Sequence, residues 1–171
     1  AVGVPASVAE RYQPTPAALD RIAAETGEID GLIIASPANP TGTMLPAEDM
    51  QALAAYCDDR GIRLISDEIY HGITYSMPGT TALEHTSNAF VVNSFSKYYS
   101  MTGWRVGWMV IPEDLQRSVE CLAQNIFISV PTLSQRAACA AFDCTEELDA
   151  NVARYAANRE LLLAELPKAG L

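Results

Sequence analysis

The chain has 171 residues, of which 49% are hydrophobic and 19% charged, and its formal net charge is −10. This length allows one α/β domain with a buried core. The acidic balance argues against a nucleic-acid partner, and no apolar run approaches the ~20 residues that a membrane-spanning helix needs.

Short apolar runs alternate with helical patterns in the first third of the chain. Residues 1–5 resemble the tail of a strand, and residues 15–26 predict a helix with Pro16 at its first position. Residues 31–35 form an apolar run typical of a buried parallel strand. Residues 46–60 then predict a second helix.

The same alternation continues to the end of the chain. Further predicted strands are residues 62–66, 89–93 and 106–110. Further predicted helices are residues 113–127, 132–142 and 146–168. This order indicates an α/β fold with a mostly parallel sheet and helices on both of its faces. The longest irregular stretch, residues 72–88, is rich in Gly, Thr, Ser and Pro and predicts a surface excursion.

Three polar residues follow three of the predicted strands. Asn39 comes after the first strand, Asp67 after the second and Lys97 after the third. Ligands of parallel sheets lie outside the carboxyl ends of the strands. We therefore expect these three side chains at one rim, with the Lys97 amine as a candidate nucleophile toward carbonyl groups.

The neighbours of Lys97 predict an anion site. Arg105 stands between Gly103 and Gly107, which allow close approach of backbone to a ligand, and Ser94 precedes Lys97. A guanidinium grips a phosphate with two hydrogen bonds. The alternative is that Arg105 forms a salt bridge with one of the many acidic side chains.

Asp67 and Tyr70 supply groups that suit a pyridine ring. A carboxylate at the end of an apolar strand needs a cationic partner, which a protonated pyridine nitrogen provides. Tyr70 can donate to an oxygen on the same ring. The alternative readings are a turn carboxylate for Asp67 and simple packing for Tyr70, and we also assign Tyr98 to packing. His71 and His85 show no partner pattern.

The cysteines do not indicate a metal site. They show neither a Cys-x-x-Cys motif nor a Cys/His spacing suited to zinc. The cysteines are Cys57, Cys121, Cys139 and Cys144. We expect reduced thiols in a cytoplasmic protein without a bound metal.

The motifs taken in order resemble those of the class I/II aminotransferases, which are fold type I pyridoxal-phosphate enzymes. The motifs that carry the resemblance are Asn39-Pro40-Thr41-Gly42, Asp67-Glu68-Ile69-Tyr70 and Ser94-x-Ser96-Lys97 with Arg105. The match extends over nearly the whole chain, including Gln124-Asn125 and residues 131–135.

The resemblance implies a role for each matching residue. Lys97 forms the Schiff base with the cofactor and carries the proton to and from the substrate α-carbon. Asp67 pairs with the pyridine nitrogen, and Tyr70 and Asn39 bind the ring oxygen. The Asn39–Pro40 peptide is expected to be cis, as in some relatives.

The resemblance also implies a phosphate site, an antiparallel strand and a larger protein. Ser94 and Arg105 hold the phosphate, with help from Ser96, and the strand after Arg105 runs antiparallel to the others. Residues 1–145 correspond to the central part of a large domain, and residues 146–171 to a helix that leads toward a small domain. Family members are more than twice as long and complete their active sites as homodimers.

We therefore interpret the chain as part of an aminotransferase that moves an amino group from an amino acid to a 2-oxo acid, and we expect the 171 residues alone to be inactive. Two alternatives remain open. One is a C–S β-lyase on the same fold, and the other is the cofactor-sensing part of a transcriptional regulator.

Overall fold

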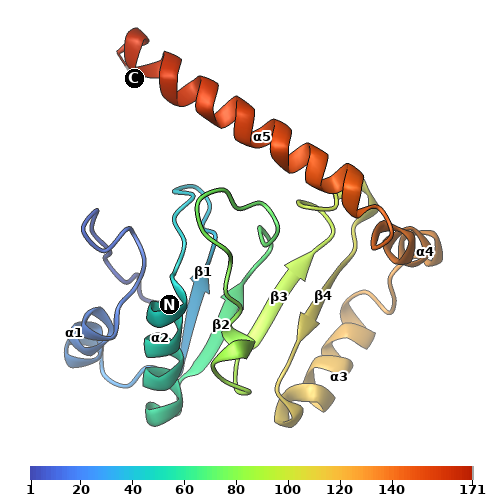
Figure 1. Ribbon diagram of the computed structural model, residues 1–171. Helices are drawn as coiled ribbons and strands as arrows, with labels where there is room; N and C mark the ends of the chain where they lie inside the picture. The colour runs from blue at the N-terminus through green and yellow to red at the C-terminus, as the bar shows by residue number, and fades with distance from the viewer. Residues whose placement is uncertain (171) are drawn as a thin grey trace.

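The computed structural model describes residues 1–170 and contains one four-stranded sheet of order β1-β2-β3-β4 (Figure 1). The strands are β1 (Gly31–Ala35), β2 (Arg63–Asp67), β3 (Phe90–Ser94) and β4 (Gly107–Val110). The first three strands pair in parallel, and β4 pairs antiparallel with β3. Each strand lies within one residue of its prediction, and the antiparallel strand that the resemblance implied is confirmed.

The described residues also form five α-helices. They are α1 (Pro16–Thr26), α2 (Ala47–Arg60), α3 (Gln116–Ile126), α4 (Thr132–Ala141) and α5 (Thr145–Glu165). Short 3-10 turns are η1 (Ala82–Glu84), η2 (Thr102–Trp104), η3 (Glu113–Leu115) and η4 (Leu166–Ala169). The prediction of a strand tail over residues 1–5 is wrong, because these residues pair with no sheet edge, although Val4 packs against the core.

Local signals begin and end the first two helices. The Thr15 hydroxyl accepts a hydrogen bond from the Ala18 amide at 3.2 Å, which satisfies one of the free donors at the start of α1. Helix α2 ends at Gly61, whose left-handed backbone (φ 67°) lets its amide close the last turn on Cys57 and Asp58.

The main core lies between α1, α2 and one face of the sheet. Alternate strand residues point into it, namely Leu32 and Ile34 of β1, Leu64 of β2 and Val91 of β3. Leu53 of α2 meets them and is 0% exposed. This pattern is the period of two expected of a sheet with one face against a core.

The opposite face of the sheet is less covered in the described part of the chain. Ile33 of β1 is 73% exposed there, and Ile65 and Val92 are half-buried. Helices α3 and α4 lie beyond β4 (Figure 1), where α4 packs on a second cluster around Phe95 and Met101. The predicted α/β class with a mostly parallel sheet is confirmed. The helical cover is concentrated on the face of the sheet that packs against α1 and α2, with Leu32 and Ile34 of β1 in that core.

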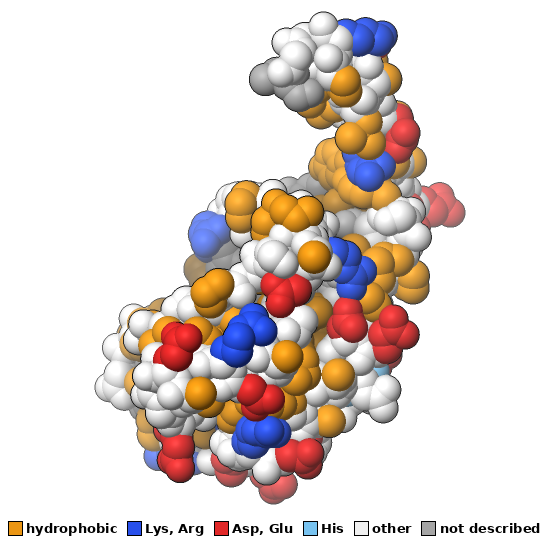
Figure 2. All heavy atoms as spheres, turned by 90° about the vertical axis from the view of Figure 1, so that its left-hand side faces the viewer, with side chains coloured by type: hydrophobic (Ala, Val, Ile, Leu, Met, Phe, Trp, Pro, Cys, Tyr) orange, Lys and Arg blue, Asp and Glu red, His pale blue; other side chains and the backbone are white. Residues whose placement is uncertain are grey.

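Helix α5 crosses above the sheet edge at which the parallel strands β1, β2 and β3 end, and it then projects from the body (Figures 1 and 2). Apolar side chains remain exposed on this projection. They are Leu161, Leu162, Leu163 and Leu166. Among the described helices, none has the length and apolar character to cross a membrane.

Replacing Leu53 with Ala tests the main core. We expect a loss of roughly 3 kcal/mol in the free energy of unfolding, because the cavity cannot refill in a close-packed interior. Leu161 of α5 is 60% exposed, so Leu161→Ala serves as the matched control and should cost less than about 0.5 kcal/mol. Urea denaturation followed by circular dichroism measures both changes, and equal losses would contradict the assignment of the core.

Candidate active site

Three of the predicted site residues meet above the carboxyl ends of the parallel strands. The Asn39 side-chain amide lies 3.5 Å from the Tyr70 hydroxyl. The Lys97 Nζ stands 5.2 Å from the centroid of the Tyr70 ring. The loops that follow β1, β2 and β3 therefore bring an amide, a phenol and an amine together. The strand order predicted Asn39 and Lys97 at this edge, together with Asp67, but it did not include Tyr70. The Asn39–Pro40 peptide is cis, as expected, and the Ser36–Pro37 peptide is cis as well.

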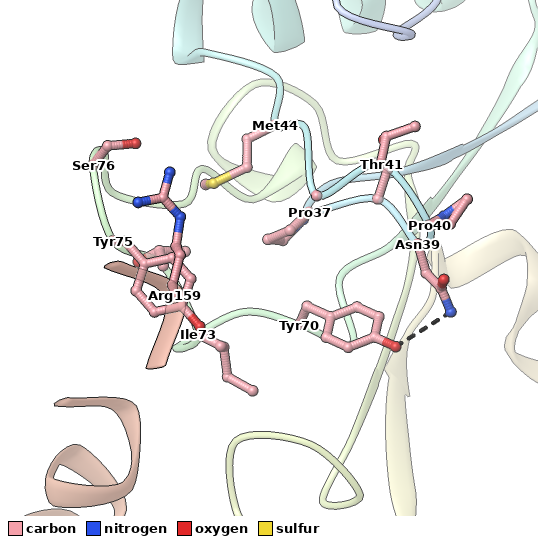
Figure 3. A pocket seen from close by; sticks show the side chains of 13 residues that line it. Pro37, Asn39, Pro40, Thr41, Met44, Tyr70, Ile73, Tyr75, Ser76 and Arg159 are labelled. Atoms are coloured by element: carbon pink, nitrogen blue, oxygen red, sulfur yellow. Dashed lines mark hydrogen bonds between the residues drawn. The ribbon is translucent and has the colours of Figure 1, made fainter. Parts of the chain in front are cut away.

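A cavity of about 430 Å³ opens beside this group (Figure 3). Asn39 and Tyr70 line one side, and Tyr75 and Arg159 line the other. Arg159 belongs to α5, and its guanidinium lies 5.6 Å from the centroid of the Tyr75 ring. Sequence reasoning missed Arg159 because nothing in its helical surroundings distinguishes it from Arg154, the other exposed cation of α5.

Asp67 ends β2 on the less covered face of the sheet. It is half-buried and pairs in register with Val92, so it shares this face with Val92 and, two residues further along β3, with Ser94. Its Oδ1 accepts a hydrogen bond from the Ile69 amide at 3.0 Å, which fits the turn-carboxylate alternative. Within residues 1–170 no Lys or Arg forms an ion pair with Asp67, so the carboxylate can still serve a cationic ligand.

Ser94, Ser96 and Arg105 line a second cavity of about 430 Å³ together with Phe127 and residues 129–131. The Ser94 hydroxyl donates to the Ser96 hydroxyl at 2.9 Å. Arg105 is exposed, holds a left-handed backbone (φ 53°) and donates to the Thr102 carbonyl at 2.9 Å. The salt-bridge alternative for Arg105 is wrong for residues 1–170, since none of their acidic side chains pairs with it.

Gly103 and Gly107, which flank Arg105, were expected to let the backbone approach a ligand closely, and they do not both do so. A Cβ at Gly107 would lie 2.7 Å from the Asn93 carbonyl oxygen, so this glycine lets β4 approach the backbone of β3. A Cβ at Gly103 would meet nothing within 4 Å. Gly107 therefore serves the sheet, and through it the placement of Ser94 on β3.

Glu68 is a buried acid that the sequence analysis left without a role. It is 2% exposed and accepts hydrogen bonds from the Ser66 hydroxyl at 3.0 Å and the Ala82 amide at 2.9 Å. The His71 Nδ1 lies 3.4 Å from its other oxygen. Glu68 thus ties the irregular stretch over residues 72–88 to the end of β2, where Asp67 and Tyr70 stand.

Tyr98 does more than pack. Its hydroxyl donates a hydrogen bond to the Asp149 carboxylate of α5 at 2.7 Å. This bond, together with burial and the negative charge of Asp149, raises the pKa of Tyr98 to about 12. A Cβ at Gly72 would lie 2.6 Å from the Tyr98 ring, so the turn after Tyr70 rests directly on that ring.

The described residues offer an amine, a carboxylate and a guanidinium, and no cluster of His, Cys, Asp or Glu among them could hold a metal ion. The cysteines are unpaired, and burial raises the pKa of the Cys57 thiol to about 11. Cys57 is therefore a poor nucleophile near neutral pH. Among the groups at the sheet edge, the Lys97 amine is the one suited to attack a carbonyl group.

The family described as aminotransferase class I and II matches residues 2–171. The chain is 49% identical to the valine–pyruvate aminotransferase of Mycobacterium tuberculosis, over 99% of this chain and 44% of that protein. It is 33% identical to the aspartate aminotransferase of Geobacillus stearothermophilus, over 80% of this chain and 35% of that protein. The chain thus spans less than half the length of these relatives.

Solved structures agree with the sequence comparison. An aminotransferase from Mycobacterium tuberculosis superposes with a TM-score of 0.90 at 49% identity, over 98% of this chain and 46% of that one. A mutant of the Thermus thermophilus aspartate aminotransferase gives a TM-score of 0.89 at 30% identity, over 99% of this chain and 48% of that one. The chain belongs to the class I and II aminotransferase family.

The ionisation of Tyr98 tests the contact with α5. Tyr98 should still be protonated where an ordinary tyrosine of pKa 10.0 is half ionised, because its pKa is about 12. The hydrogen bond then stabilises the fold fully below pH 10, and this stabilisation is lost as the pH rises toward 12. Ultraviolet titration of the wild type and Asp149→Ala measures this. The variant should lower the highest tyrosine pKa, and an unchanged titration curve would contradict the contact.

Proposed function

We propose that this chain carries the cofactor site of a pyridoxal-phosphate-dependent aminotransferase, which moves an amino group from an amino acid to a 2-oxo acid. One observation carries the proposal. The Lys97 amine faces the Tyr70 ring at 5.2 Å and forms no ion pair with a carboxylate of residues 1–170. A lysine held in this way at the carboxyl ends of parallel strands, where ligands of such sheets bind, can attack a carbonyl group.

The residues around Lys97 suit the cofactor from several sides. Asp67, half-buried and without a cationic partner in the described chain, would hold the protonated ring nitrogen. Asn39 and Tyr70, 3.5 Å apart, would donate to the ring oxygen. Ser94 and Arg105, which line one cavity, would hold the phosphate.

The chain's own groups then position the reaction and move a proton. When bound, pyridoxal phosphate supplies an aldehyde and a ring that withdraws electrons from the substrate α-carbon. The Lys97 Nζ would take the α-proton and return it, acting as general base and then as general acid. Asp67 would keep the ring nitrogen charged by ion pairing, and Tyr70 would orient the ring beside the amine.

The proposal extends to the partners and the setting of the whole protein. The relatives are more than twice as long as this chain, so we propose that the 171 residues bind the cofactor but need the rest of the protein for turnover. The segment from residue 146 would lead into a small domain. A second copy would complete the site, and the unpaired cysteines support a cytoplasmic location.

Selective labelling of Lys97 tests the proposed cofactor site. The chain has two lysines, Lys97 and Lys168, and Lys168 is an exposed residue paired with Glu165. After treatment with pyridoxal phosphate and borohydride, we expect peptide mass spectrometry to find the pyridoxyl group mainly on Lys97. Asp67→Ala should reduce the Lys97 label by about tenfold, because a charge-assisted contact is lost, and leave Lys168 unchanged.

Two results would count against the proposed site. One is equal labelling of both lysines in the wild type, and the other is an Asp67→Ala variant that labels like the wild type. Glu113→Ala is the matched control, since it also removes an acidic side chain, but from a turn beyond the far end of β4.

Exposed apolar side chains predict self-association. Several of them gather at the end of α3 and the start of α4, namely Leu122, Ile126, Phe127, Ile128 and Leu133. A patch of this kind favours contact with another surface. Light scattering at micromolar concentration should therefore show dimers or larger species, and a monomer would contradict this expectation.

A further inference from the structure

Tyr98 stands where three segments meet, and the proposed chemistry gives it no task. It follows Lys97 directly in the chain. Its hydroxyl donates to Asp149 of α5 at 2.7 Å, and its ring supports Gly72, two residues beyond Tyr70. The loop that carries the amine, the turn that carries the phenol and the projecting helix therefore touch one side chain.

The close approach at Gly72 shows how Tyr98 sets the spacing of the site. A Cβ at this position would lie 2.6 Å from the ring, and the backbone there is left-handed (φ 89°). The turn after Tyr70 can therefore come no nearer to the loop of Lys97. Because Lys97 and Tyr98 share a peptide unit, the ring of Tyr98 limits how closely the backbone of Lys97 approaches the turn that follows Tyr70.

The bond to Asp149 is the hydrogen bond that joins this loop to α5 in the described residues. The loop is otherwise held by its own bonds, such as the Met101 amide to the Phe95 carbonyl at 3.0 Å and the Thr102 hydroxyl to the Ser96 carbonyl at 2.7 Å. In residues 1–170 no other hydrogen bond joins residues 95–101 to α5. A displacement of α5 at Asp149 is therefore transmitted to Tyr98.

We propose that Tyr98 is a positioning residue that couples the placement of α5 to the placement of the Lys97 amine beside Tyr70. The inference rests on the proposed function, in which Lys97 is the reacting amine. Tyr98 touches neither substrate nor cofactor in this scheme, and it acts by holding the backbone of its neighbour. Helix α5 projects beyond the body (Figure 2), so whatever moves this helix would adjust the amine.

The experiment compares four variants of the chain: Tyr98→Phe, Asp149→Ala, the double variant, and Asp149→Asn, which keeps an acceptor oxygen. Two quantities are measured near neutral pH. One is the ratio of pyridoxyl label on Lys97 to that on Lys168, and the other is amide hydrogen exchange of residues 97–101. Glu147→Ala, an exposed acid on the same turn of α5, is the matched control, and thermal unfolding confirms that each variant is folded.

We expect Tyr98→Phe and Asp149→Ala each to lower the labelling ratio by about fivefold, the factor that corresponds to one lost hydrogen bond. The double variant should be no worse than either single variant, because both remove the same link. Asp149→Ala should speed exchange at residues 97–101 although it lies on α5, whereas Asp149→Asn and Glu147→Ala should behave like the wild type.

The outcomes separate this inference from the proposed function. Additive losses in the double variant, or exchange at residues 97–101 that is the same in Asp149→Ala as in Glu147→Ala, would overturn the coupling. A wild type without preference for Lys97 would instead overturn the cofactor site. Hydrogen exchange would then still decide whether Tyr98 links α5 to the loop.

Discussion

The parallel pairing of β1, β2 and β3 is the constraint on which the candidate site depends. Parallel strands end at the same edge of a sheet, so the residues that follow them meet there whatever their separation in sequence. Asn39, Tyr70 and Lys97 come together for this reason. Buried Glu68 also helps to hold the site together, because its carboxylate accepts a hydrogen bond from the Ala82 amide. This bond fastens the long irregular stretch after Tyr70 to the end of β2. A buried acid is tolerated here because its oxygens have partners.

Much of this fold was predictable from local patterns. The apolar run of residues 31–35 and the helix that ends before Gly61 carry their own signals, in periodicity and in a left-handed glycine. The direction of β4 was not predictable from its residues, because an apolar run reads alike in both directions, and the family resemblance had to supply it. The strand tail predicted over residues 1–5 was wrong for a different reason. An extended apolar segment becomes a strand only where it can pair with the edge of a sheet.

The residue types of the candidate site were predictable from the sequence, whereas the residues that support the site were less predictable. Asn39, Asp67 and Lys97 stand at strand ends, where chemistry-bearing residues can be recognised. Tyr98 and Arg159 gain their importance from α5, which approaches from more than fifty residues further along the chain. No local pattern reports such a contact. The supporting residues could therefore be identified only from the structure.

A crystal structure of the chain grown with pyridoxal phosphate would test the central claim most directly, which is that the residues at the sheet edge hold one cofactor molecule together. The account predicts the phosphate at Ser94 and Arg105, the ring nitrogen at the Asp67 carboxylate and the reactive carbon at the Lys97 Nζ. A cofactor bound at Lys168, or one at Lys97 with its ring turned away from Asp67, would contradict it.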